Sequence, residues 1–206
     1  MRLGILVSGR GSNLEAVLDA VVDGRLPAVE PALVIANRPG IRALEVAARR
    51  GVAWRLMPRS DFPSVEARDA AVGRVLTEAG CELALLAGYD QFLGPSYFAA
   101  FAGRTINIHP SLLPRYGGRG MIGLAVHAAV LAAGDAETGV TIHDVTPLLD
   151  AGPEIAQVRV AVHQGDTVAD LAERVLAVEH QALVEVLAGL SASMTDASPA
   201  PIQARR

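Results

Sequence analysis

The chain has a single cysteine, Cys81, among its 206 residues, so it cannot form an intramolecular disulfide. A lone thiol that we interpret as structural is typical of a reducing compartment. The first apolar run, residues 3–7, is too short for the core of a secretion signal. No stretch approaches the roughly 20 apolar residues that cross a bilayer. These absences predict a cytoplasmic protein.

The chain also lacks an excess of charge of one sign. Its formal net charge is -4, which gives no general attraction to nucleic acid or to an anionic membrane. Because 51% of the residues are hydrophobic, the chain can bury a full core without disulfides or metals. We therefore expect small-molecule partners, no nucleic acid and no membrane, and either a monomer or a homodimer.

Short apolar runs alternate with longer helical patterns through the first half. Such runs are typical of buried parallel strands in βαβ units, and here they cover residues 3–7, 32–36, 52–57, 83–87 and 105–108. Two further strands are predicted at residues 140–145 and 155–162, followed by an amphipathic helix over 168–190. The pattern predicts a single doubly wound α/β domain, residues 1–190, with a mostly parallel sheet and helices on both faces. The small, polar, proline-containing residues 191–206 predict a mobile tail.

A glycine-rich turn, Ser-Gly-Arg-Gly-Ser-Asn at residues 8–13, joins the first strand to the first helix. Converging backbone N–H groups and the helix dipole suit such a turn to phosphate. Leu14 replaces the third glycine of a dinucleotide motif, and the ending of a Walker loop is absent. The turn therefore favours a single phosphate, and its alternative is a tight turn in which Ser12 or Asn13 caps the helix.

Asn107 and His109 come at the end of the fifth predicted strand. Residues two apart in a strand share a face, and catalytic groups gather at the carboxyl ends of parallel strands. An amide N–H and an imidazolium could stabilise an oxyanion, whereas a neutral imidazole could accept a proton. The alternative is a capped strand end with a hydrogen-bonded core histidine.

The segment Asn-Ile-His-Pro-Ser-Leu-Leu-Pro-Arg-Tyr, residues 107–116, closely resembles the signature of the 10-formyltetrahydrofolate-dependent formyltransferases. Further matching pieces follow in the same order along the chain, at residues 8–13, 86–89, 139–143, 149–153 and 179–180. The glycine turn and the length make the chain similar to the branch that formylates glycinamide ribonucleotide. The resemblance implies a formyltransferase-type Rossmann-like fold, with 10-formyltetrahydrofolate as the formyl donor and no metal.

The same resemblance assigns Asn107, His109 and Asp150 to catalysis. It implies that Asn107 and protonated His109 hold the formyl oxygen while the substrate amine attacks. Asp150 is expected to raise the pKa of His109 and to help pass a proton through water to the folate nitrogen. We expect His143, on the strand before Asp150, to support this group.

The resemblance also places the two ligands. It puts the substrate phosphate on Gly11, Ser12 and Asn13, and a ribose contact on Glu179, which without the resemblance would be interpreted as a solvated helix residue. It puts the pterin along two segments, Gln91, Phe92 and Leu93 in the first and Leu148 and Leu149 beside Asp150 in the second. An ordinary buried turn would have a similar sequence. We expect His127, His163 and His180 to be surface or capping residues.

Three features depart from the family pattern. A glycine-rich segment, residues 116–127, predicts a mobile loop over the site, in which Arg119 either reaches an anionic ligand or belongs to a passive insertion. Leu176 stands where some relatives have a polar ribose contact, and Asp90 stands where an apolar residue is common. Three alternatives stay open: a formyltransferase for another phosphorylated amine, a formyltetrahydrofolate hydrolase, and a non-catalytic binding module.

Overall fold

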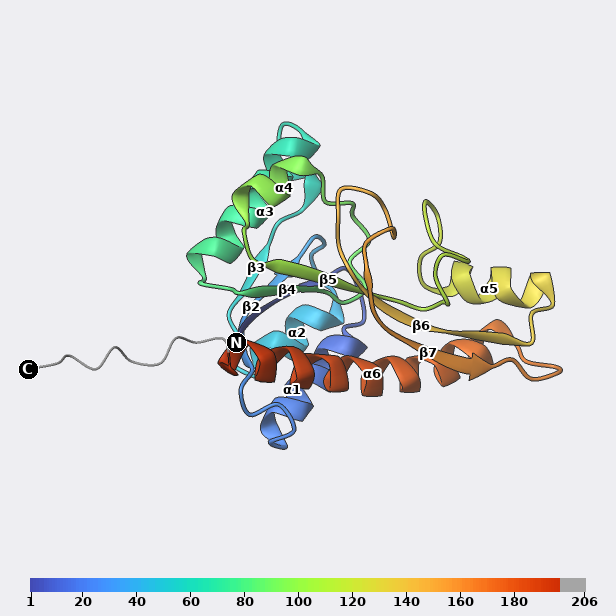
Figure 1. Ribbon diagram of the computed structural model, residues 1–206. Helices are drawn as coiled ribbons and strands as arrows, with labels where there is room; N and C mark the ends of the chain where they lie inside the picture. The colour runs from blue at the N-terminus through green and yellow to red at the C-terminus, as the bar shows by residue number, and fades with distance from the viewer. Residues whose placement is uncertain (197–206) are drawn as a thin grey trace, which may run out of the picture.

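The computed structural model describes residues 1–196 and contains one seven-stranded sheet with the order β3-β2-β1-β4-β5-β6-β7 (Figure 1). The first five strands are parallel, and β6 and β7 are antiparallel to their neighbours. The strand bounds are β1 Arg2–Val7, β2 Glu30–Ala36, β3 Trp54–Leu56, β4 Leu83–Leu86, β5 Arg104–His109, β6 Glu137–Asp144 and β7 Glu154–Ala161. The mostly parallel sheet predicted from the apolar runs is confirmed.

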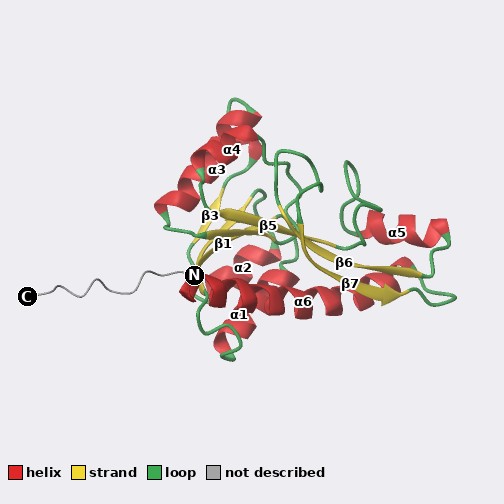
Figure 2. Cartoon of the chain, in the orientation of Figure 1, coloured by secondary structure: helices red, strands yellow, loops and turns green. Residues whose placement is uncertain are grey.

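Helices cover both faces of this sheet, as Figures 1 and 2 show. Their bounds are α1 Ser12–Val22, α2 Arg42–Arg49, α3 Val65–Glu78, α4 Pro95–Ala100, α5 Leu124–Ala133 and α6 Val168–Asp196, with a short 3-10 turn at Arg59–Asp61. One core joins the sheet to α1, α2, α5 and α6, and the other joins it to α3 and α4. Alternation along β1 explains the two cores, because Leu3, Ile5 and Val7 face the first and Leu6 faces the second.

The strand order reverses between β1 and β4, which are adjacent in the sheet although two strands separate them in the sequence. Ligands of open α/β sheets bind at such a switch point, beyond the carboxyl ends of the strands. The glycine turn after β1, the segment after β4 and the polar end of β5 all lie at this edge. The topology therefore brings three predicted parts of the site together.

Two helices were missed by the sequence interpretation. α4 has only six residues, and α5 begins inside the segment that we expected to be a loop, residues 116–127. Glycines at 117, 118, 120 and 123 interrupt any helical pattern before α5, which hides its start. The loop is therefore shorter than predicted.

The last helix also extends beyond its predicted end at residue 190. α6 continues to Asp196, and Ser191 is buried, with its hydroxyl donating to the carbonyl of Ala188 at 2.9 Å. The domain boundary predicted at 190 therefore falls inside the helix. The rest of the predicted tail, residues 197–206, lies outside the described residues.

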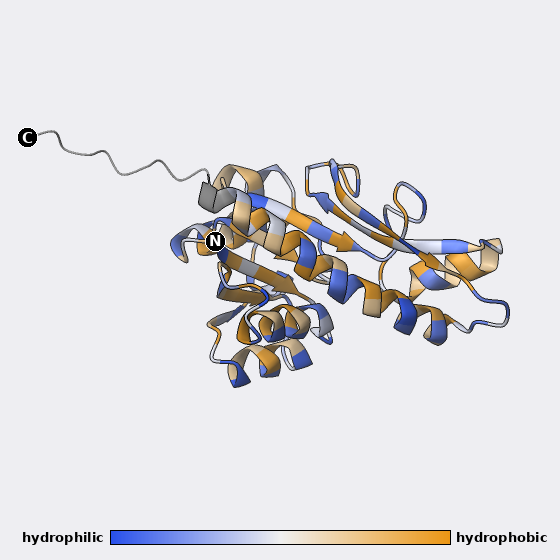
Figure 3. Cartoon of the chain, turned by 60° about the horizontal axis from the view of Figure 1, so that its bottom comes forward, coloured by the Kyte–Doolittle hydropathy of each residue, from blue (hydrophilic) through white to orange (hydrophobic). Residues whose placement is uncertain are grey.

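Contrary to the sequence prediction, one stretch of the chain does reach a membrane-spanning length. Residues Val168–Ser193 of α6 form a helix long and apolar enough to cross a bilayer by length and composition. This is weak evidence, because a helix in the core of a soluble protein passes the same test. Hydrophilic and apolar positions are interleaved along α6 (Figure 3), and its apolar positions pack on the sheet and α1.

Candidate active site

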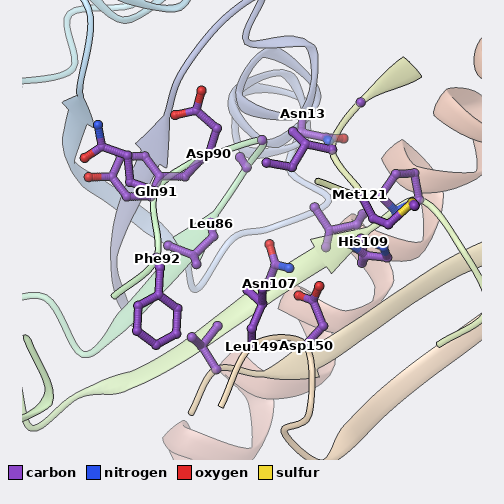
Figure 4. Close-up of a pocket in the computed structure, with 18 of the residues that line it drawn as sticks. Asn13, Leu86, Asp90, Gln91, Phe92, Asn107, His109, Met121, Leu149 and Asp150 are labelled. Carbon is purple, nitrogen blue, oxygen red and sulfur yellow. The ribbon is translucent and has the colours of Figure 1, made fainter. Parts of the chain in front are cut away.

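A cleft of about 620 Å³ opens at the carboxyl edge of the sheet. Its walls are the glycine turn after β1, the segment after β4, the end of β5, the glycine-rich segment before α5, the loop after β6 and the middle of α6. All the predicted catalytic and ligand-binding residues line it, from Gly11 near one end to Leu149 near the other. Figure 4 shows Asn107, His109 and Asp150 together among these side chains.

Asn107 is positioned by a hydrogen bond to His143 on the neighbouring strand β6. Nδ1 of His143 lies 2.9 Å from the carbonyl oxygen of Asp144, which can only accept, so Nδ1 carries the ring proton of a neutral His143. Nε2 then accepts from the Asn107 side-chain Nδ2 at 3.2 Å. One amide hydrogen of Asn107 is fixed in this way, and the second remains for a ligand oxygen. The supporting position predicted for His143 agrees with this contact.

His109 is held by the backbone of the segment that follows it. Its Nε2 lies 2.7 Å from the carbonyl oxygen of Tyr116, so Nε2 carries a hydrogen and donates it. Tyr116 is itself anchored, since its hydroxyl donates to Asp135 at 2.6 Å. The ring nitrogen left for a ligand is therefore Nδ1, which accepts in the neutral ring and donates only in the imidazolium.

The protonation expected for His109 is opposed by burial. His109 is 5% exposed, and desolvation lowers its pKa from the usual value. The bond to Tyr116 and the negative charge of Asp150 raise the pKa, whereas His143 lowers it. Asp150 thus acts in the predicted direction, but the net shift is downward. The neutral ring is the favoured form of the free protein near pH 7.

Asp150 approaches the predicted catalytic residues from the loop after β6. Its backbone has φ 50°, a conformation that few residues other than glycine adopt. The Oδ2 atom accepts a 2.7 Å hydrogen bond from the backbone N–H of Gly118, and Oδ1 lies 3.8 Å from Nε2 of His143. Asp150 therefore lies between the glycine-rich segment and β6, the strand that carries His143.

The glycine turn forms the opposite end of the cleft. Gly11 is the N-cap of α1 with φ 75°, and no side chain caps the helix, which excludes the capping by Ser12 or Asn13 that was the alternative. A Cβ atom on Gly11 would lie 2.7 Å from the Cβ atom of Ala43, so the turn also needs glycine for space. The uncapped end of α1 therefore directs backbone N–H groups and the positive end of its dipole into the cleft.

Glu179 of α6 faces this turn. It is 8% exposed and accepts a 2.8 Å hydrogen bond from Nδ2 of Asn13, so the solvated position that the sequence alone suggested is wrong. Burial raises its pKa to about 7, against the lowering effects of Asn13 and Arg10. Oδ1 of Asn13 is buried without a hydrogen-bond partner within the described residues. The pair can accept and donate hydrogen bonds to a polar ligand.

The predicted pterin segments form the outer wall of the cleft. Phe92, Leu148 and Leu149 are 45%, 71% and 47% exposed, which is unusual for such large apolar side chains and leaves surface for a flat ligand to cover. Leu93 is 2% exposed and belongs to the core beside α3 and α4. Gln91 lines the cleft while its side chain contacts Arg68.

Asp90, which departs from the family pattern, joins the ends of three strands. Its carboxylate accepts from the Asn37 side chain at 2.7 Å and pairs with Arg38, both after β2. Its backbone N–H donates to the hydroxyl of Ser8, after β1, at 3.0 Å. The acidic residue therefore stabilises the edge of the cleft. Leu176 also lines the cleft.

Two features of the site were missed in the sequence. His127 is 4% exposed and lines the cleft, so the surface position expected for it is wrong, and its Nδ1 is buried without a partner in the described chain. The burial of His127 was not predicted, because residues 116–127 were expected to form a loop and α5 was not recognised. The second feature is a buried ion pair, Arg68 and Asp69 on α3, behind the predicted pterin segment at residues 91–93. Adjacent opposite charges in a helical pattern gave no signal of burial.

The remaining histidines differ from each other. His163 is exposed, as expected, and its backbone N–H donates to Asp166. His180 is half-buried, and its Nε2 is buried without a partner within residues 1–196.

Cys81 is 8% exposed, and burial raises the pKa of its thiol to about 11, as a structural cysteine requires. Within the part of the chain that the structure describes, no cluster of three or more His, Cys, Asp or Glu side chains could hold a metal ion.

Comparison with known proteins places these residues in a family. The model of the formyl transferase family matches residues 1–187. The chain is 38% identical over 180 residues to the phosphoribosylglycinamide formyltransferase of Escherichia coli, covering 87% of this chain and 82% of that protein. It is 39% identical over 191 residues to the trifunctional purine biosynthetic protein adenosine-3 of Drosophila pseudoobscura pseudoobscura, covering 92% of this chain but only 14% of that protein.

A solved structure agrees with these relatives. The glycinamide ribonucleotide transformylase 1 of Symbiobacterium toebii superimposes with a TM-score of 0.87 at 40% identity, covering 94% of this chain and 88% of that one. The Rossmann-like fold predicted from the resemblance is confirmed by this match.

Proposed function

The chain belongs to the formyl transferase family, and on that basis we propose that it transfers a formyl group from 10-formyltetrahydrofolate to the amine of glycinamide ribonucleotide, a step of purine biosynthesis. The observation that carries this proposal is one cleft with two chemically different ends. At one end the uncapped N-terminus of α1 and Glu179 suit a sugar phosphate. At the other end exposed apolar side chains suit a flat heterocycle, and Asn107, His109 and Asp150 lie between them.

The phosphate of the nucleotide binds at Gly11, Ser12 and Asn13. Backbone N–H groups at a helix N-terminus and the helix dipole favour an anion, and Arg10 lines the cleft in the same turn. Glu179, through its contact with Asn13, presents its carboxyl group to the ribose hydroxyls. A Glu179 pKa of about 7 limits its negative charge beside a bound phosphate. The folate pterin lies between residues 91–93 and Leu148–Asp150.

Transfer begins when the unprotonated amine of the nucleotide attacks the formyl carbon. The carbonyl oxygen becomes an oxyanion, which accepts from the second Nδ2 hydrogen of Asn107 and from Nδ1–H of His109. Because His109 donates from Nδ1 only as the imidazolium, its pKa has to rise in the complex. The developing negative charge and Asp150 both act in that direction.

The second half of the reaction expels the folate. Asp150 accepts the proton released by the attacking amine and passes it through water to the folate nitrogen, whose bond to the formyl carbon breaks. The products are the formylated nucleotide and tetrahydrofolate. Neither a metal ion nor a covalent bond to the protein is part of this scheme.

Relatives differ in how much more chain they contain. This chain spans 82% of the Escherichia coli relative but 14% of the trifunctional insect relative, so only formyl transfer is proposed for it. The cytoplasmic location predicted from the single cysteine stays a prediction, as does the choice between a monomer and a homodimer.

The deciding experiment measures release of tetrahydrofolate by its absorbance, with and without glycinamide ribonucleotide. Turnover that requires the nucleotide, with one formylated nucleotide formed per folate, is the expected result. Folate turnover without the nucleotide would indicate hydrolysis, with water in place of the amine. Binding of both ligands without turnover would indicate a non-catalytic module, and turnover only with another phosphorylated amine would change the acceptor.

A further inference from the structure

Behind the folate end of the cleft lies an ion pair that is almost completely removed from solvent. Arg68 and Asp69, adjacent on α3, have side chains that are 4% and 2% exposed. Nε of Arg68 donates to Oδ1 of Asp69 at 2.9 Å, and its Nη2 contacts the same oxygen. A buried charge pair stabilises a protein only when further hydrogen bonds satisfy both groups. The partners in those hydrogen bonds therefore show which segment of the chain the ion pair keeps in place.

Within residues 1–196, every other side-chain hydrogen bond of the pair goes to the segment between β4 and α4. Arg68 donates from Nη2 to the carbonyl oxygen of Phe92 at 2.7 Å and from Nη1 to Oε1 of Gln91. Asp69 uses its second oxygen, Oδ2, to accept from the backbone N–H of Gly94 at 2.8 Å, where α4 begins. Residues 91–94 are thus connected to α3 at three points, and residues 91–93 line the cleft.

The contact with Arg68 also fixes the orientation of the Gln91 amide. A guanidinium has only donors, so it selects the oxygen of the amide and leaves the Nε2 hydrogens for other partners. Gln91 is half-buried and lines the cleft, and in Figure 4 it lies beyond Phe92 and Asp90, away from His109. An amide held in this way presents a hydrogen-bond donor to the outer part of the cleft.

We propose that Arg68 and Asp69 are positioning residues for the folate, acting through the backbone of residues 92–94 and through the Gln91 amide. This inference rests on the proposed function, since it assigns the segment to the folate and not to the nucleotide. The pair determines folate affinity, whereas the nucleotide end of the cleft and the catalytic group are independent of it.

The test uses Arg68→Lys, which keeps the positive charge beside Asp69. A lysine ammonium lacks the planar fork and cannot hold Asp69, Gln91 and Phe92 in the same geometry. We expect the KM for 10-formyltetrahydrofolate and the dissociation constant of tetrahydrofolate, measured by calorimetry, to rise about five- to tenfold, as expected for one or two lost hydrogen bonds. The KM for the nucleotide and kcat should stay within about twofold of the wild type.

Arg74→Lys is the matched control, because Arg74 is an exposed arginine on the same helix. It should leave all these constants unchanged. Gln91→Ala supplies a second variant that leaves the contact between Arg68 and Asp69 intact, and it should weaken folate binding while lowering the melting temperature less than Arg68→Lys does. Combined with Arg68→Lys, its effect should be less than additive, because both changes remove the same oriented amide.

The outcomes separate this inference from the proposed function. If the wild-type protein fails to bind tetrahydrofolate, both the proposed function and the positioning role of the pair are wrong. If the wild type binds it and Arg68→Lys binds it equally well, the positioning role is wrong while the proposed function stands. Equal weakening of folate and nucleotide binding would show that the pair supports the whole domain and would also overturn the inference.

Discussion

The side-chain amide of Asn13 donates a 2.8 Å hydrogen bond to Oε2 of Glu179, although 166 positions separate the two residues in the chain. Asn13 belongs to the first turn of α1 and Glu179 to the middle of α6, and the two helices pack on the same face of the sheet. The contact joins the proposed phosphate turn to the proposed ribose ligand. The proposed nucleotide end of the cleft is therefore built from residues near the beginning and near the end of the domain.

The raised pKa of Glu179 predicts a specific dependence of stability on pH. A carboxyl group with a pKa of about 7 when folded, against 4.5 when exposed, binds its proton more tightly in the folded state. The free energy of unfolding should therefore fall as pH rises from about 4.5 to about 7, by roughly 3 kcal/mol at most, and this contribution should then stay constant. Urea denaturation across this range measures it.

Glu179→Gln is the control for that experiment. The glutamine does not ionise, and its side-chain oxygen can still accept from Asn13. The difference in stability between variant and wild type should grow in favour of the variant as pH rises through the window. Parallel curves for the two proteins would contradict the raised pKa.

Replacing His109 should greatly reduce turnover. His109→Ala removes the Nδ1 donor proposed for the oxyanion, and such groups contribute at least about a hundredfold to kcat. The folate absorbance assay measures this loss. Because His109 is buried against Tyr116, the melting temperature has to be measured beside the rate. A folded variant with near-normal turnover would remove His109 from the mechanism.

The His109 ring should titrate below the range of an exposed histidine in the free protein. Desolvation lowers its pKa, and the charge of Asp150 partly opposes this effect. In Asp150→Asn the charge is absent, so the pKa should fall further. Titration of the ring protons by NMR gives both values. A higher pKa in Asp150→Asn would show that Asp150 does not act on His109 as proposed.

The glycine turn offers a matched pair of substitutions. Gly11→Ala places a Cβ atom 2.7 Å from Cβ and 2.8 Å from Cα of Ala43, at a φ of +75°. We expect a loss of about 1–2 kcal/mol in unfolding free energy from the backbone conformation alone, together with a higher KM for the nucleotide. Denaturation and steady-state kinetics measure the two effects.

Gly9→Ala is the comparison for Gly11→Ala, because no heavy atom lies within 4 Å of its added Cβ. It should leave the unfolding free energy close to the wild-type value. If both variants lower the unfolding free energy equally, the conformation of Gly11 is not the specific requirement of the turn.

The sequence alone determined where the strands of the sheet lie along the chain. A buried strand and an amphipathic helix each produce a local periodic pattern, which can be recognised without the tertiary structure. The runs at residues 3–7 and 83–87 correspond to β1 and β4. The predicted sites at residues 11–13, at Asn107 and His109, and at Asp150 depended on recognisable motifs, and the fold brings all of them to one cleft. Their chemical roles remain predictions.

The tertiary structure decided what depends on distant residues. Whether His109 is charged depends on its desolvation and on groups from three segments, and burial reversed the shift that its acidic neighbour alone would produce. Glu179, which without the resemblance would be interpreted as solvated, and His127, which was expected at the surface, are both buried in the cleft wall. Burial depends on what packs over a helix and not on the residue type. The Arg68–Asp69 pair was invisible in the sequence for the same reason: its partners, Gln91, Phe92 and Gly94, lie more than 20 positions away and meet it only after α3 packs beside the segment after β4.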